Sequence, residues 1–261
     1  MIVPPEVSSK SKLNHLFAAT LEGLFPNYCY LCGLRSHREQ PLCHGCQDDL
    51  SANETCCSRC ALPLSQAEPQ LAQGNTPLQR LCGQCLASPP AFDRALAPCL
   101  YEEQMAFLLH RWKFHAERRL STLFAYLWLS QVSKQLAIPD IIVPVPLHWT
   151  KTWQRGFNQS ELFAVELRRQ CRELRKVKLD TRLVQRHRAT SAQSGLAAGE
   201  RQANMRGAFT ARRRCDNLRV AIVDDVLTTG ATAAAIATTL RDAGASHIEI
   251  WCLARTPEPQ Y

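Results

Sequence analysis

The stretch Val220–Thr232, VAIVDDVLTTGAT, decides the fold of this 261-residue chain. Its four apolar residues at the start predict a buried strand over 219–223, and the residues that follow predict a loop over 224–230 that leads into a helix over 231–243. Gly244 is suited to close that helix, and the alternating residues 247–253 predict the next strand. Strand, helix and strand in this order form a right-handed crossover, so we expect an α/β fold with a mainly parallel sheet.

Two carboxylates and a run of small residues stand where the predicted strand meets the helix. Ionised carboxylates only accept hydrogen bonds, which suits Asp224 and Asp225 to bind the neighbouring hydroxyls of a ribose. Backbone N–H groups at a helix start attract an anion such as a phosphate, and ligands of open α/β sheets bind at the carboxyl ends of the strands. The segment therefore predicts a site for a sugar and its phosphate, made by Asp224, Asp225, Val226, Thr228, Thr229, Gly230, Ala231 and Thr232.

Nine of the 13 cysteines lie between Cys29 and Cys85, and eight of these nine form four CxxC pairs. Two such pairs can surround one tetrahedral ion, so the spacing predicts two closed, structural zinc sites. Consecutive pairing is the main prediction; interleaved pairing, or Cys56 in place of Cys57, are the alternatives. A redox role is a lesser alternative, because four pairs are not a thioredoxin pattern. The predicted ligands are Cys29, Cys32, Cys43 and Cys46 in one site, and Cys57, Cys60, Cys82 and Cys85 in the other.

Basic residues are concentrated in one part of the chain. Residues 168–219 hold 15 Lys and Arg against 4 Asp and Glu, a net charge of +11 that exceeds the +8 of the whole chain. Such a segment attracts polyanions, although an ordinary solvated face is the alternative. Arg168, Arg172 and Lys176 recur every four residues, which predicts one basic helix face able to bind DNA.

The composition is that of a globular protein, and the texture of the sequence changes after Pro90. We predict three segments: 1–28 with a short helix, 29–90 with the zinc sites, and 91–261 with the sheet. No apolar run approaches the roughly 18 residues of a membrane span, and no secretory signal is visible, so a cytoplasmic protein is expected. Beyond the first motif, the patterns predict strands at 97–101, 141–146 and 183–184, helices over 104–115, 120–136 and 160–171, and a long loop over 186–204.

The motif VAIVDDVLTTGAT resembles the phosphoribosyl-pyrophosphate motif of type I phosphoribosyltransferases. From Cys29 to Thr256 the chain is similar to the ComF/GntX family of bacterial competence and DNA-utilisation proteins. The similarity is carried by CYLC, CHGC, CSRC and CGQC, by VPVPLHWTKTWQRGFNQS at 143–160, by SAQSGLAAGERQANMRGAF at 191–209, and by the motif itself. It implies a double zinc ribbon followed by a domain of the type I phosphoribosyltransferase fold.

The resemblance also implies further site residues. Lys151 and Arg155 follow the predicted strand 141–146, where enzymes of this fold hold the pyrophosphate, and they would join Asp224 and Asp225 in any catalysis. Lys113 is a weaker candidate for the same pocket, as is Arg111, and Arg188 lies in a segment that resembles the loop closing over the reaction. Mg²⁺ would accompany phosphoribosyl pyrophosphate.

Three functions are compatible with these features. The resemblance favours a protein that binds phosphoribosyl pyrophosphate and single-stranded DNA during uptake or utilisation of extracellular DNA, together with proteins of an uptake machinery. A metabolic phosphoribosyltransferase of nucleotide synthesis or salvage is the alternative, and a regulator that senses the ligand is the third. No segment specifies an acceptor base, so the sequence supports the donor site better than a reaction.

Overall fold

The computed structural model describes residues 26–65, 80–115, 117–147, 156–187 and 207–258. The chain forms two compact units, Met1–Asp49 and Leu50–Tyr261, each described here by itself. The boundary falls inside the predicted zinc segment and leaves the second cysteine group in the same unit as the sheet. The three-segment division stays a prediction. The predicted short helix before residue 26 lies outside the described residues.

The two cysteine segments have the same local structure, one in each unit. A bridge between Tyr28 and Arg35 flanks the first CxxC pair, and a bridge between Cys56 and Pro63 flanks the second. The second CxxC pair of each segment starts a short helix, α2 (His44–Asp48) or α3 (Gly83–Ala87). The two segments are therefore structural repeats, although one is incorporated in the larger unit.

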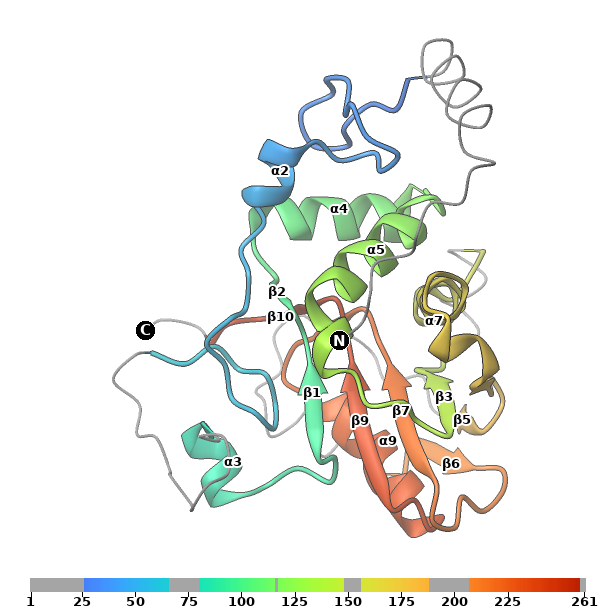
Figure 1. Cartoon of the computed structure of the whole chain (residues 1–261). Coiled ribbons are helices and arrows are strands. Elements are labelled where there is room, and N and C mark those ends of the chain that lie inside the picture. Colours follow the sequence, from blue (N-terminus) through green and yellow to red (C-terminus); the bar gives the residue numbers. More distant parts are fainter. Residues whose placement is uncertain (1–25, 66–79, 116, 148–155, 188–206, 259–261) are drawn as a thin grey trace. The chain divides into compact units, whose positions relative to one another are not determined.

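The larger unit is built on a five-stranded parallel sheet, and this confirms the expected fold class (Figure 1). The predicted strand before the two aspartates is observed with the expected bounds, and every neighbouring pair in the sheet is parallel. The order is β1 (Arg94–Leu96), β9 (His247–Trp251), β7 (Arg219–Val223), β3 (Ile141–Pro144) and β4 (Lys178–Leu179).

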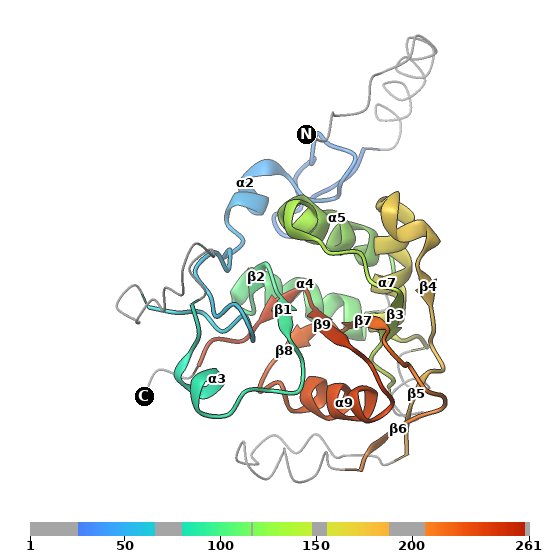
Figure 2. The same ribbon diagram turned by 60° about the horizontal axis from the view of Figure 1, so that its bottom comes forward.

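Helices cover both faces of this sheet, as Figure 2 shows. On one face α9 (Ala231–Asp242) buries Ile236 and Leu240 against alternate residues of β7 and β9. On the other face lie α5 (Leu120–Val132) and α7 (Gln159–Gln170), where the Trp128 ring contacts those of Phe163 and Trp251 at centroid distances of 6.3 and 5.2 Å. Because both faces are covered, the central strands are apolar throughout.

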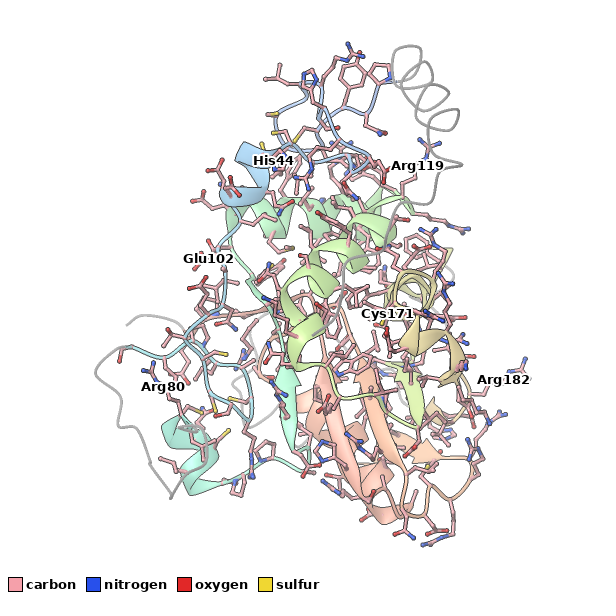
Figure 3. The ribbon with its side chains drawn as sticks, viewed as in Figure 1. His44, Arg80, Glu102, Arg119, Cys171 and Arg182 are labelled. Carbon is pink, nitrogen blue, oxygen red and sulfur yellow. The ribbon has the colours of Figure 1, made fainter. Side chains whose placement is uncertain are left out.

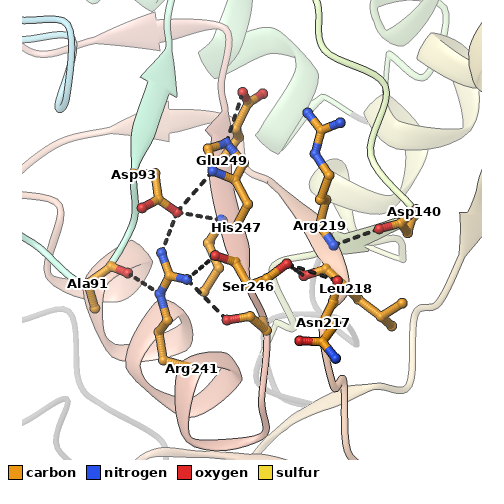
Figure 4. Close-up of polar contacts among 12 residues, drawn as sticks. Ala91, Asp93, Asp140, Asn217, Leu218, Arg219, Arg241, Ser246, His247 and Glu249 are labelled. Atoms are coloured by element: carbon orange, nitrogen blue, oxygen red, sulfur yellow. Dashed lines mark hydrogen bonds and ion pairs between the residues drawn. The ribbon is translucent and has the colours of Figure 1, made fainter.

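A network of polar contacts holds the edge strand β1 beside β9 (Figure 4). The Asp93 carboxylate accepts hydrogen bonds from the Arg241 guanidinium and, at 2.7 Å, from the backbone N–H of Ile248. Asp93 Oδ2 also lies 3.4 Å from His247 Nδ1, and the buried Glu249 accepts a hydrogen bond from Trp251 Nε1. The contacts of Asp93 lie at the amino end of β9.

Short strands account for the main differences from the expected elements. The strand expected over 97–101 is observed only in its central part, as β2 (Cys99–Leu100). β1 ends at Leu96, and Pro98 between them cannot donate a ladder hydrogen bond. The expected loop 224–230 contains β8 (Val226–Leu227). It joins a three-stranded parallel sheet in the order β2, β10 (Ala254–Arg255), β8.

The remaining elements lie near their predicted positions. The helix expected over 104–115 is α4 (Glu103–Phe114), and that over 120–136 is α5 followed by the 3-10 turn η1 (Ser133–Gln135). The strand at 183–184 is β5 (Val184–Arg186), paired antiparallel with β6 (Phe209–Ala211). Within the described part of the chain, none of the helices has the length and apolar character needed to cross a membrane.

Candidate functional site

The two aspartates of the motif lie directly after β7, at the carboxyl end of the sheet. The backbone N–H of Asp224 donates to the Trp251 carbonyl at 2.9 Å, so β9 holds the end of the strand in place. Asp224 Oδ1 accepts hydrogen bonds from Ser160 Oγ at 3.1 Å and from the Asp225 N–H at 2.9 Å. Lys113 Nζ lies 2.7 Å from Asp225 Oδ2. The structure thus joins the motif to α4 and α7.

The ionisation of Asp224 is costly in this position. Burial raises the pKa of its carboxyl group to about 7, and the negative charge of Asp225 acts in the same direction. The Asp225 N–H, the Lys113 ammonium and the Ser160 hydroxyl oppose this rise without cancelling it. Near neutral pH the aspartate pair can therefore gain or lose one proton. A ligand that supplies hydroxyl donors or a cation favours the ionised form of Asp224.

After β8, residues 228–230 form a loop that leads to the start of α9. Thr228 and Thr229 are exposed, and Gly230 has φ +77°, a left-handed conformation that costs a residue with a Cβ about 1 kcal/mol or more. No side chain caps α9 at Gly230, and the Ala231 N–H makes only a 3.4 Å contact with Thr229 Oγ1. Free N–H groups and the helix dipole at this end can hold an anion such as a phosphate.

The structure describes the positions of two of the cationic residues predicted to bind the pyrophosphate. Lys113 lies at the site, paired with Asp225. Arg111 instead pairs with Glu117, with Nη2 and Oε1 2.5 Å apart. Lys151, Arg155 and Arg188 lie outside the described residues.

Two residues of the site were missed by the sequence reasoning. Ser160 was named only as the start of the expected helix over 160–171 and as part of a family segment, yet the residue is 3% exposed and its hydroxyl contacts Asp224. Arg186 on β5 has a lowered pKa because of burial, and the Asp224 charge partly offsets that decrease. Its guanidinium also lies 5.7 Å from the Phe209 ring centroid. The signal for Ser160 was Asn158, whose side chain caps α7 by accepting from the Ser160 N–H.

The structure gathers the eight predicted cysteines in two groups. The groups follow chain order, so the interleaved alternative is wrong, and Cys56 belongs to neither. In each group the four sulfur atoms lie within 4.8 Å of one another; they are yellow in Figure 3. Two of the separations are 3.9 Å, between Cys32 and Cys43, and 3.6 Å, between Cys60 and Cys82. Zn–S bonds of about 2.3 Å in a tetrahedron place the sulfurs about 3.8 Å apart, so both groups fit a zinc ion.

The crowding of these thiols shifts their pKa values in opposite directions. Hydrogen bonds from Cys60 and Cys85 hold the pKa of Cys57 far below that of an ordinary thiol. The hydrogen bond with Cys57 in turn raises the pKa of Cys60 to about 12. Crowded thiols cannot ionise together unaided, whereas a divalent cation stabilises all four thiolates.

The predicted basic helix face is wrong in its geometry. The helix α7 ends at Gln170, Cys171 is extended, and a separate 3-10 turn, η2 (Glu173–Lys176), follows. Arg168 is half-buried and donates from Nη2 to the Arg175 carbonyl at 3.0 Å. Arg172 and Lys176 are exposed. The three residues therefore do not line one helix, although the neighbourhood remains basic, and the Arg182 side chain extends outward in Figure 3.

Fold and site together define a class of protein: a parallel α/β domain with a carboxylate pair and a helix start at one strand end, joined to two four-cysteine metal sites. Residues 20–88 match the model of the double zinc ribbon domain. The DNA utilization protein YhgH of Salmonella typhimurium is 34% identical over 239 residues, 88% of this chain and 98% of that protein. Competence protein F of Haemophilus influenzae is 32% identical over 223 residues, 82% of this chain and 90% of that protein. The chain belongs to the ComF family of competence and DNA-utilisation proteins.

Two solved structures are also similar to part of the chain. An allosteric regulatory enzyme of purine biosynthesis matches 52% of this chain and 25% of its own, with 18% identity and a TM-score of 0.31. A purine phosphoribosyltransferase from Pyrococcus horikoshii matches 53% of this chain and 88% of its own, with 14% identity and a TM-score of 0.29. At these scores neither match carries an argument.

Proposed function

We propose that the chain binds phosphoribosyl pyrophosphate at the end of β7 and acts with single-stranded DNA in the uptake or utilisation of extracellular DNA. The carrying observation is the arrangement of Asp224 and Asp225 immediately before the exposed start of α9, with Lys113 beside them. The carboxylates accept from the ribose hydroxyls, and residues 228–232 receive the 5′-phosphate. The names of the relatives, competence protein and DNA utilization protein, support the cellular role.

The diphosphate end of the ligand requires further positive charge. By the family resemblance, Lys151 and Arg155 supply it, together with Arg188, which follows β5 in the sequence. Lys113 lies at the site, so its ammonium can contact a diphosphate oxygen of the ligand in place of the Asp225 carboxylate. Mg²⁺ bound with the ligand would neutralise the diphosphate and withdraw charge from it as a leaving group.

Binding can be measured by calorimetry with phosphoribosyl pyrophosphate and Mg²⁺. Asp225→Asn should weaken binding at least about tenfold, because it removes a charge that the ligand hydroxyls or the ion contact. Asp242→Asn, at the exposed far end of α9, is the matched control and should bind like the wild type. Absence of binding to the wild type would refute the ligand proposal. Release of pyrophosphate that depends on an added nucleobase would instead establish the metabolic transferase.

For DNA, the described residues offer a second surface besides Arg168, Arg172 and Lys176. The face of α4 that carries Phe107, His110 and Phe114 is exposed, with the two phenylalanines 48% and 61% exposed. The His110 and Phe114 rings lie 4.7 Å apart, and the Arg111 guanidinium lies 5.7 Å from the Phe107 ring. Aromatic side chains interleaved with cations suit single-stranded nucleic acid, because each base stacked on a ring contributes about 1 to 3 kcal/mol.

Fluorescence anisotropy with a labelled single strand, over a series of salt concentrations, tests both surfaces. Neutralising Arg168, Arg172 and Lys176 should reduce the salt slope, because those residues contact phosphates. The double change Phe107→Ala and Phe114→Ala should weaken binding at all salt concentrations. Val165→Ala, an exposed apolar residue on α7, is the control. DNA affinity unchanged in every variant would remove both surfaces from the proposal.

The remaining parts of the proposal rest on the family. We propose that the protein works in the cytoplasm, where incoming single strands arrive, and that it contacts proteins of the uptake machinery. Co-purification of such proteins with the tagged wild-type chain, under conditions that exclude DNA bridging by nuclease treatment, tests this part.

A further inference from the structure

A single arginine connects the ligand loop with the second cysteine group. Arg255 lies on β10 and is 7% exposed. Its Nη1 donates to the carbonyls of Leu227 at 2.9 Å, of Thr256 at 2.8 Å, and of Thr228. Its Nε donates to the Cys60 carbonyl at 3.2 Å. All of these residues belong to the larger unit.

The contacts of Arg255 orient the peptide groups of the loop. In a planar trans peptide the C=O of one residue and the N–H of the next point in opposite directions. Because the carbonyls of Leu227 and Thr228 face Arg255, the N–H groups of Thr228 and Thr229 face away from it. Thr228 and Thr229 are exposed, so an anion that approaches the loop from solvent can reach these donors. Arg255 thus presents the loop as an anion receptor.

The charge of Arg255 acts in the same direction. Three backbone carbonyls share the two hydrogens of its Nη1 and a fourth accepts from its Nε, and the ion pairs of the described residues do not include it. Backbone dipoles solvate a buried cation without cancelling its net charge. A positive charge therefore remains beneath the loop and favours an anion above it.

The fourth contact makes the loop depend on the cysteine group. Cys60 is one of the four clustered thiols, and its carbonyl is positioned by the tight turn that they close. In that turn the Cys57 N–H donates to the Leu62 carbonyl and the Ala61 N–H to the Cys57 carbonyl, both at 2.8 Å. Ala61 has a φ of +55°, which an L side chain adopts only when the surroundings impose it. A metal held by the four thiolates supplies such a constraint.

We propose that Arg255 is a positioning residue through which the second metal site, but not the first, holds residues 226–230 in the anion-binding conformation. The effect of Arg255 on anion binding rests on the proposed function, whereas the effect of the second metal site on the conformation of residues 226–230 does not. The matched pair of variants is Cys82→Ser and Cys43→Ser. Each cysteine precedes a short helix in its own group, and each change removes one thiolate.

The first measurement is hydrogen exchange by mass spectrometry on the full chain, with metal content measured in parallel. The amides of Leu253 and Thr256 donate to the Asp225 and Leu227 carbonyls and report on the loop. Cys82→Ser should speed their exchange at least about tenfold, whereas Cys43→Ser should leave it unchanged. Equal effects of the two variants, or none, would overturn the proposal.

The second measurement separates the arginine from general loss of structure. Arg255→Met should weaken phosphoribosyl pyrophosphate binding about tenfold or more. Arg255→Lys should bind the ligand more tightly than Arg255→Met but less tightly than the wild type, because one ammonium cannot reach all four carbonyls. In the Arg255→Met background, Cys82→Ser should then cause little further loss. Additive losses would refute the coupling. If the wild type does not bind the ligand, the proposed function fails, while the exchange experiment still decides the inference.

Discussion

The substitution Asp224→Asn should stabilise the ligand-free protein, and the gain should grow with pH. Burial raises the pKa of this carboxyl from 3.8 to about 7 in the folded chain. Between these values the folded protein binds a proton that the unfolded chain has released. The free energy of unfolding of the wild type therefore falls as the pH rises through this window, and above pH 7 the loss is complete. Asparagine does not titrate, so the variant escapes this loss.

The size of the effect follows from the shift. The difference between a pKa of 3.8 and one of about 7 corresponds to about 4 kcal/mol in the free energy of unfolding. About 2 kcal/mol of this difference in stability develops between pH 5.5 and 8. In this pH range zinc also stays bound to its thiolates. Asparagine keeps one oxygen to accept from Ser160 and from the Asp225 N–H, so the variant should lose few contacts.

Urea unfolding of the ligand-free protein at a series of pH values between 5.5 and 8.5 measures this difference. The free energy of unfolding of Asp224→Asn minus that of the wild type should increase steadily across the range. Asp242→Asn, which changes an exposed carboxylate, should give a nearly flat difference. A flat difference for Asp224→Asn as well, or a variant less stable than the wild type at pH 8, would show that burial of this carboxylate is not costly.

Three further outcomes are expected. Metal analysis of the purified chain should give about two zinc ions per molecule, because two closed four-sulfur groups are present, and a value near one would contradict this. Lys113→Met should raise the pKa of Asp224 further, since the ammonium opposes the rise, and a carbon-13 NMR titration of the carboxylate with an unchanged midpoint would contradict it. Gly33→Ala should destabilise the turn of the first cysteine group by about 1 kcal/mol, because Gly33 has a positive φ, and transfer of its zinc to a chelator should become faster. Ala61 also has a positive φ, so Ala61→Gly should stabilise the turn of the second group and slow the transfer of its zinc.

The sequence predicted the central unit because its signals are local. The strand Arg219–Val223 and the start of α9 at Ala231 agree with the expected bounds, since an apolar run and a glycine turn are read from neighbouring residues. The cysteine groups also follow from spacing. A CxxC turn brings its two thiols together by itself, so only the pairing of turns remained open.

Long-range contacts could not be predicted in the same way. Arg186 and Arg255 lie on strands of three and two residues, too short for a hydrophobic period to appear. The end of α7 was misjudged for a related reason. Leu174 is fully buried, and the chain must leave the helix at Cys171 to place it there, a demand of packing that a repeat of basic residues does not reveal.

The loop at the end of β7 lies between two charged groups that are costly without a ligand. Asp224 is a half-buried carboxylate with a raised pKa, and Arg255 is a 7% exposed cation whose partners among the described residues are backbone carbonyls. Gly230 has the left-handed conformation that glycine tolerates. The charge of Asp224 becomes favourable when hydroxyl donors lie at the aspartates, and that of Arg255 when an anion lies over the loop. This coincidence argues that the loop is maintained for binding, and it predicts that Asp224→Asn, which stabilises the free protein, weakens binding of the ligand.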